Sequence, residues 1–103
     1  MSEFGWTSSG LLAADAVIKA GGGKLGGCAV ISDGTNAVSL LVYDHASAAS
    51  GTLLAGISIG ASPATGALTQ GVWFGDKGIT ALNGLYADVT QATGTIKFIV
   101  WYE

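Results

Sequence analysis

The reactive side chains of this chain are few: it has one His, one Cys and seven Asp or Glu. His45 directly follows Asp44, and a His beside a carboxylate activates the nucleophile in many hydrolases. Neighbouring residues of a strand point to opposite faces, however, and no Ser or Cys stands at a spacing typical of such a site. We therefore interpret His45 as a loop histidine at the end of a strand, and we expect His45→Ala to have no effect on function.

Cys28 lies within an apolar run, residues 27–32. A thiol in such a run usually behaves as a small buried hydrophobe. A nucleophilic thiolate needs nearby positive charge, and the nearest cation in sequence is Lys24. Cys28 is interpreted as a core residue.

Two short motifs resemble ligand loops without completing them. Asp33-Gly34-Thr35-Asn36 looks like the first half of a calcium loop but lacks the later ligands and the distal Glu. Gly21-Gly22-Gly23-Lys24 looks like a phosphate loop but lacks the spaced glycines and the trailing Ser or Thr. Turns explain both motifs, so we expect no metal and no cofactor.

The aspartates Asp33, Asp44, Asp76 and Asp88 are candidates for the two acids of a glycoside hydrolase. Aspartate is also common in turns, and the sequence brings no two of these residues together. We predict no catalytic residue, and the chain is not expected to be an enzyme.

Aromatic residues are a stronger lead. Trp73-Phe74 and Trp101-Tyr102 are consecutive pairs, and consecutive residues of a strand cannot both face one core. One member of each pair is therefore expected outside, where Trp and Tyr mark protein contacts or sugar-stacking platforms. The predicted interface candidates are Phe4, Trp6, Trp73, Phe74, Ile99 and Trp101.

Two-residue alternation between turn clusters predicts an all-β fold. Val38, Leu40 and Val42 share one face of residues 37–44, and the turn 33–36 joins this strand to the run 27–32. Because Asp, Gly and Asn suit tight turns, we predict that these two runs form a β-hairpin.

A second hairpin is predicted at the C-terminus, with residues 85–90 and 95–103 joined by a turn at 91–94. Ile96, Phe98 and Val100 alternate there and form the expected core face. Ile99 and Trp101 would then point the other way, as interface candidates.

Further strands are predicted at 52–59, with Leu53, Ala55, Ile57 and Ile59 on one side, and within 66–74, with a loop at 60–66 between them. Residues 11–20 fit either a short helix or a strand and turn, and we favour the strand. Residues 1–10 are interpreted as an N-terminal arm that docks on a neighbouring subunit or on the domain itself. Residues 11–103 form one domain, a compact antiparallel β-sandwich (jelly-roll-like) or small barrel of about six to eight strands.

Composition limits the function. Charged residues make up 11% of the chain against roughly a quarter in ordinary domains, so the surface is suited to being covered by a partner. A net charge of −3 without Arg offers no basic patch for nucleic acid. No apolar run approaches the ~20 residues of a membrane helix, and the first residues lack the basic and apolar regions of a signal peptide. We expect cytosolic synthesis and no binding to nucleic acid or membrane.

Four segments carry a family resemblance: 16–21, 25–27, 41–52 and 83–90. With them, the chain resembles a widespread group of small tailed-bacteriophage virion proteins encoded among head and tail genes. The resemblance runs from about residue 16 to 102 and is most specific at 43–52, where His45 stands in place of the expected Asn. It implies a β-sandwich building block of the capsid surface or tail and carries over no catalytic residue.

Composition and resemblance predict a non-enzymatic virion protein, made in the bacterial host cytoplasm. It would act as a homo-oligomer that decorates the capsid or serves as a head/tail accessory, with capsid or tail proteins as partners. The alternative is a carbohydrate-binding or host-adhesion module that stacks glycans on Trp73, Trp101 or Tyr102.

Overall fold

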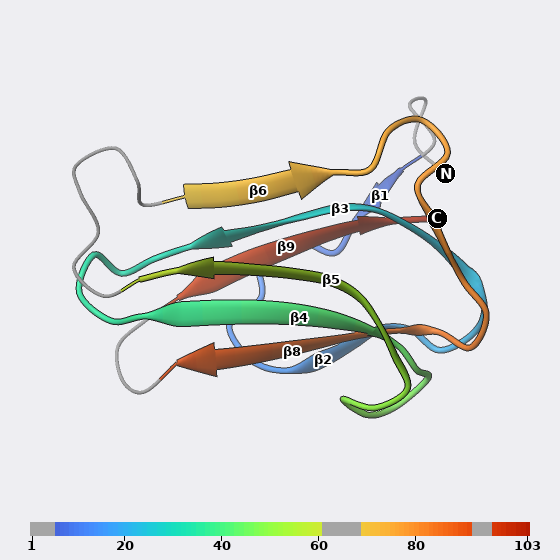
Figure 1. Cartoon of the computed structure of the whole chain (residues 1–103), viewed down its shortest axis with the longest axis horizontal. Helices are drawn as coiled ribbons and strands as arrows, with labels where there is room; N and C mark the ends of the chain where they lie inside the picture. Colours follow the sequence, from blue (N-terminus) through green and yellow to red (C-terminus); the bar gives the residue numbers. More distant parts are fainter. Residues whose placement is uncertain (1–5, 61–68, 92–95) are drawn as a thin grey trace.

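The computed structural model describes residues 6–60, 69–91 and 96–103 (Figure 1). These residues form nine strands in two antiparallel sheets that pack face to face. The all-β sandwich predicted from the sequence is confirmed. The described part of the chain contains no helix with the length and apolarity needed to cross a membrane.

Sheet A is built around a long strand, β3, which pairs on both sides. Its strand order is β1-β9-β3-β6, and β7 pairs with the first residues of β3. The strands of sheet A are β1 (Thr7–Ser8), β3 (Gly23–Ile31), β6 (Thr69–Trp73), β7 (Ile79–Ala81) and β9 (Lys97–Tyr102).

Sheet B has the order β2-β8-β4-β5. In Figure 1 the strands β5, β4 and β8 of sheet B are drawn below β6, β3 and β9 of sheet A, and β6 is the uppermost of these strands. The strands of sheet B are β2 (Ala16–Lys19), β4 (Val38–Asp44), β5 (Thr52–Ile59) and β8 (Leu85–Gln91).

Both predicted hairpins are wrong. β3 and β4 lie in different sheets, and so do β8 and β9. At the first crossing, the Ser32 hydroxyl accepts a bond from the Gly34 N–H, and the Asp33 carboxylate accepts bonds from Thr35 and Asn36. These bonds shape a loop that carries the chain from one layer to the other. The alternation of apolar residues indicated which face of each strand is buried. It did not indicate whether two consecutive strands pair in one sheet or pack against each other from opposite sheets, because both arrangements produce the same alternation. The turn at 92–94 lies outside the described residues.

The core lies between the sheets and follows the predicted faces. Ile96, Phe98 and Val100 are at most 3% exposed, which confirms the core face of β9. Sheet B contributes alternate residues of β4 and β8, which meet the buried residues of β3. The buried apolar residues of these three strands are Leu25, Cys28, Val30, Val38, Leu40, Val42, Leu85 and Ala87.

β5 has the predicted bounds, but its faces change part-way along. Val42 pairs with Ala55 and Tyr43 with Leu53, so Leu54 is an extra residue in the ladder. Such a bulge reorients the side chains around it. Leu54 packs against the core, whereas Leu53 is 51% exposed. The expectation that Leu53 shares the face of Ala55 is therefore wrong.

The N-terminal third is extended. Residues 16–19 form β2, which confirms a strand over a helix at this point. Leu12 forms an isolated bridge with Phe98, and β1 pairs with β9 at the edge of sheet A. Residues 7–12 therefore run along the domain, whereas Phe4 lies outside the described residues.

Candidate functional site

Asp44 and His45 hold turns. The Asp44 carboxylate accepts backbone bonds from Asn83 at 2.7 Å, Leu82 at 3.1 Å and Gly84 at 3.3 Å. The N–H groups of Asn83 and Leu82 lower the pKa of this carboxyl, although burial acts in the opposite direction. The side chain ties the end of β4 to the loop before β8.

His45 caps the turn that follows β4. Its Nδ1 atom accepts bonds from the backbone N–H groups of Ser47 at 3.1 Å and Ala48 at 3.0 Å. An Asn side chain accepts similar bonds from residues further along its own turn. A His or an Asn at position 45 can therefore cap this type of turn.

Cys28 lies in the core, fully buried and free of any disulfide. Burial raises the pKa of its thiol to about 11. The thiolate is the reactive form, so this environment suits an apolar role.

Neither loop motif forms a ligand site: the motif at Asp33 is a turn, and the second half of the motif at Gly21 belongs to a strand. Asp33 Oδ2 accepts a bond from the Asn36 side chain, so its oxygens are directed into its own turn. Gly23 and Lys24 are already part of β3. Within the described ranges no three His, Cys, Asp or Glu residues gather as metal ligands.

Asp88 lies beside Asp15, a pairing that the sequence analysis missed. Burial, then the charge of Asp15 and a hydrogen bond with its side chain, raise the pKa of Asp88. Asp15 also accepts a 2.8 Å bond from the Val89 N–H. Leu41 and Asp88 are directly paired on β4 and β8, so the two carboxyls lie on the outer side of sheet B, away from the core. Sequence spacing gave no signal, because 73 positions separate them.

The outer face of sheet A carries the main feature of the surface, a bulge at Gly26 and Gly27. Leu25 pairs with Tyr102 and Gly27 with Trp101, so β3 has one residue more than β9 at this point. Leu25 and Cys28 both face the core with no exposure. The extra residue lets both glycines lie on the outer side between them.

All three tryptophans of the chain gather at this bulge. Trp101 and Trp73 pair with Gly27 from its two sides, one on β9 and one on β6. A Cβ atom on Gly27 would overlap the Trp73 indole, and one on Gly26 would lie 2.6 Å from the Trp6 ring. The rings thus occupy the space that the glycines leave open, and bulky residues there are excluded. We call this surface, formed by Trp6, Trp73 and Trp101 around Gly26 and Gly27, the tryptophan face.

Trp73 and Trp101 contact each other edge to face. Their ring centroids are 5.2 Å apart with an interplanar angle of 66°, a favoured geometry for aromatic pairs. Beside them is an open pocket of about 290 Å³, lined by Cys28, Ala29, Gly71, Val72 and the two rings. Trp73 remains 61% exposed.

Each consecutive aromatic pair is divided between the two sides of its strand. Phe74 and Tyr102 pack against the core, while Trp73 and Trp101 lie outside. The Phe74 N–H donates to the Gly26 carbonyl at 3.0 Å. Ile99 pairs with Ala29, next to the tryptophan face. Of the six interface candidates, Trp6, Trp73, Trp101 and Ile99 lie together, Phe74 lies against the core, and Phe4 is outside the described residues.

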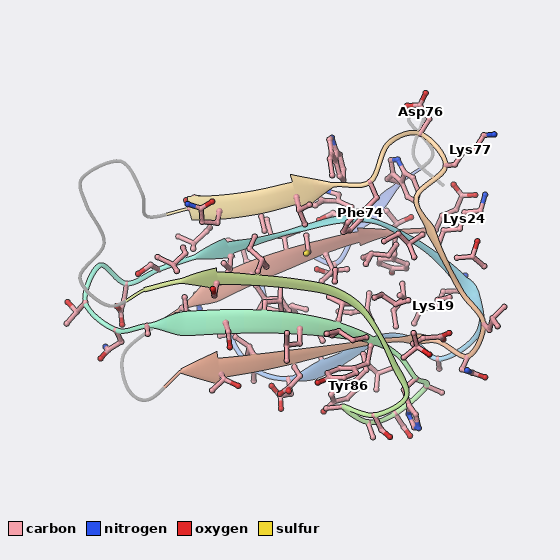
Figure 2. All side chains as sticks on the ribbon, viewed as in Figure 1. Lys19, Lys24, Phe74, Asp76, Lys77 and Tyr86 are labelled. Carbon is pink, nitrogen blue, oxygen red and sulfur yellow. The ribbon has the colours of Figure 1, made fainter. Side chains whose placement is uncertain are left out.

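Charge is kept to the margins of this surface. Within β9, β3 and β6 the charged residues are Lys24 and Lys97, each at the start of its strand. Figure 2 shows Lys24, Asp76 and Lys77 at the end of the molecule where Figure 1 marks the C-terminus. The middle of the outer face is therefore uncharged and apolar.

The tryptophans could be identified from the sequence, whereas the bulge that gathers them was not predicted. The available signal was Gly26-Gly27 inside an apolar strand, because glycine within a strand often marks a bulge or a close approach. No family model matches this chain, and neither the curated proteins nor the solved structures contain a significant match.

Proposed function

We propose that this chain is a non-enzymatic structural protein of a bacteriophage particle. It would act as a homo-oligomeric capsid-decoration or head/tail accessory subunit, made in the bacterial cytoplasm and located on the virion. The observation that carries this proposal is the tryptophan face, an uncharged aromatic surface on a sandwich whose Asp44 and His45 side chains hold turns. The resemblance to small virion proteins supports the same role.

The chemistry of the tryptophan face favours a protein partner. Tryptophan is enriched among the residues that dominate binding at protein interfaces. Here the Trp73 and Trp101 rings already pack edge to face, so less of their side-chain freedom remains to be lost on binding. An apolar patch of a capsid or tail protein would cover Trp73 and the pocket beside it.

The test is co-sedimentation with phage particles that lack the protein. Trp101→Lys places a charge on the tryptophan face but outside the core, so the variant is expected to fold and to bind at least tenfold more weakly. Val17→Lys is the matched control, because Val17 is 47% exposed and lies in sheet B. Equal binding by Trp101→Lys and wild type, or no binding by wild type, would contradict the proposal.

Glycan binding is a second candidate, favoured by the 61% exposed Trp73 beside an open pocket. Sugar sites combine stacking with well-placed polar groups. The side chains that line this pocket are apolar apart from the indole N–H groups, because the Cys28 side chain points into the core. A glycan array checks this candidate: binding abolished by Trp73→Ala would favour adhesion over capsid decoration.

A further inference from the structure

The outer edge of β6 is a backbone surface with no partner among the residues that the structure describes. β6 pairs with β3 along one side only, and all five of its residues are exposed. We propose that this edge binds a second copy of the chain, through antiparallel pairing of β6 with β6 around Gly71. The proposal rests on the homo-oligomer of the proposed function and specifies its interface.

The hydrogen-bonding groups of β6 have the right phase for this pairing. The Phe74 N–H points toward β3, because it donates to the Gly26 carbonyl. Backbone groups alternate in direction along a strand, so those of Thr69, Gly71 and Trp73 point outward. A two-fold axis at Gly71 would place Gly71 opposite Gly71, and Trp73 opposite Thr69 of the second copy. Each facing pair would then exchange both of its backbone bonds.

The side chains fit the same register. Thr69, Gly71 and Trp73 pair with Ile31, Ala29 and Gly27 on the outer face of sheet A. In the dimer, each Trp73 would lie beside Thr69 of the other copy, an aromatic and β-branched pair that stabilises sheets. Glycine at the axis would let the two backbones approach without facing side chains.

The other four edge strands carry features that discourage pairing. β1 has two residues and β7 has three, and β2 has Lys19 and an irregular register. β5 contains the bulge at Leu54. β6 has no charge, no Pro and no register shift. Natural proteins protect exposed edges with charge, Pro or bulges, so the unprotected edge is the one suited to a partner.

A second copy also fits the proposed role. The β6 pairing would join two A sheets into one continuous sheet, with both tryptophan faces on the same side. Two linked binding surfaces hold a repeating lattice more tightly than one. A contact of one strand per copy is smaller than a standard protein interface, so we expect dimerisation in the micromolar range.

The test is the solution mass by light scattering over a hundredfold concentration range that extends to high micromolar. Wild type is expected to shift from monomer to dimer. Gly71→Lys would place two like charges opposite each other and weaken dimerisation at least tenfold. A Cβ at position 71 meets its nearest atoms at 3.5 Å, an ordinary contact, so the variant should fold; far-UV circular dichroism checks this.

A charge swap makes the test specific. Mixing Gly71→Lys with Gly71→Glu would restore the dimer, because opposite charges then face each other. Ser58→Lys, on the exposed part of β5, is the control and should dimerise like wild type. Wild type that stays monomeric, a trimer, or a Gly71→Lys variant with unchanged mass would each overturn the β6 pairing. If such a protein still bound phage particles through Trp101, the β6 pairing would fail while the particle role stood.

Discussion

At the scale of single residues, the polar side chains that suggested chemistry serve the backbone instead. Asp44 accepts three backbone N–H groups from the loop before β8, and His45 accepts two from its own turn. Asp44 is the last residue of β4 and His45 is the next, at the point where the chain turns. Asp and His occur here because their side chains accept hydrogen bonds from backbone N–H groups of turns. This explains why an Asp-His pair is present without a nucleophile.

Asp44 should make the fold sensitive to acid. Its folded-state pKa is lowered by the backbone bonds from Asn83 and Leu82, so its contribution to stability is complete above the unfolded pKa of about 3.9. That contribution is lost as the pH falls through the lower folded pKa. Asp44→Ala should lower the urea midpoint at pH 7, and the gap to wild type should narrow below about pH 4. A constant gap across pH would contradict this role.

Asp88 should act in the opposite direction. Burial and the charge of Asp15 raise its pKa, so its ionisation costs stability as the pH rises from about 4 through the raised folded value. Asp88→Asn removes the repulsion and should stabilise the protein at pH 7 by about 0.5 kcal/mol, the scale of a partly exposed charge pair. Urea unfolding at pH 7 and pH 3 measures the difference in the free energy of unfolding between Asp88→Asn and wild type. This difference should vanish at pH 3.

The turn at His45 distinguishes side-chain capping from catalysis. His45→Asn should keep the turn, because the amide oxygen can accept the same kind of bonds. His45→Ala should lower the free energy of unfolding by about 1 kcal/mol, while binding to particles stays unchanged. Thermal unfolding of the two variants beside wild type checks this, and equal stability of Ala and Asn would refute the capping role.

At the scale of elements, sequence patterns determined faces better than partners. The alternation in 96–100 identified Ile96, Phe98 and Val100 as core residues, because burial imposes a period of two on each strand by itself. Strand pairing depends on the direction in which a loop takes the chain. The residues of the turn at Asp33 suit a connection between the two sheets as well as they suit a hairpin within one sheet. At Leu54 and at Gly26 the strand has one residue more than its partner, so the two-residue alternation of buried and exposed side chains is interrupted there.

The Gly26 and Gly27 bulge should not tolerate larger residues. Gly27→Ala places a Cβ inside the Trp73 ring position, so the ring or the strand must move, at a cost of roughly 1–3 kcal/mol for overpacking. Gly71→Ala on the adjacent strand is the matched control, because its nearest neighbours are 3.5 Å away. Chemical denaturation compares the stability of the two variants. An equal loss of stability in both would mean that the position of the Trp73 ring does not require glycine at position 27.

At the scale of the whole molecule, charge and apolar surface are separated. The outer face of sheet A is neutral between Lys24 and Lys97, so attraction through it would owe little to Coulomb forces. The proposed binding to phage particles should therefore change less than about twofold between low salt and 0.5 M NaCl, where exposed charges are screened within a few ångströms. Co-sedimentation across this range checks it; a steep loss of binding with salt would point to charged contacts elsewhere.

The gathering of Trp6, Trp73 and Trp101 at one bulge gives the protein an internal reporter. Every indole of the chain lies on the same face, so the intrinsic emission excited at the red edge of protein absorption comes from that face alone. A partner that covers it would shift the emission to shorter wavelength, while a partner on sheet B would leave it unchanged. The location of binding can thus be determined on the unlabelled wild-type chain, before any variant is made.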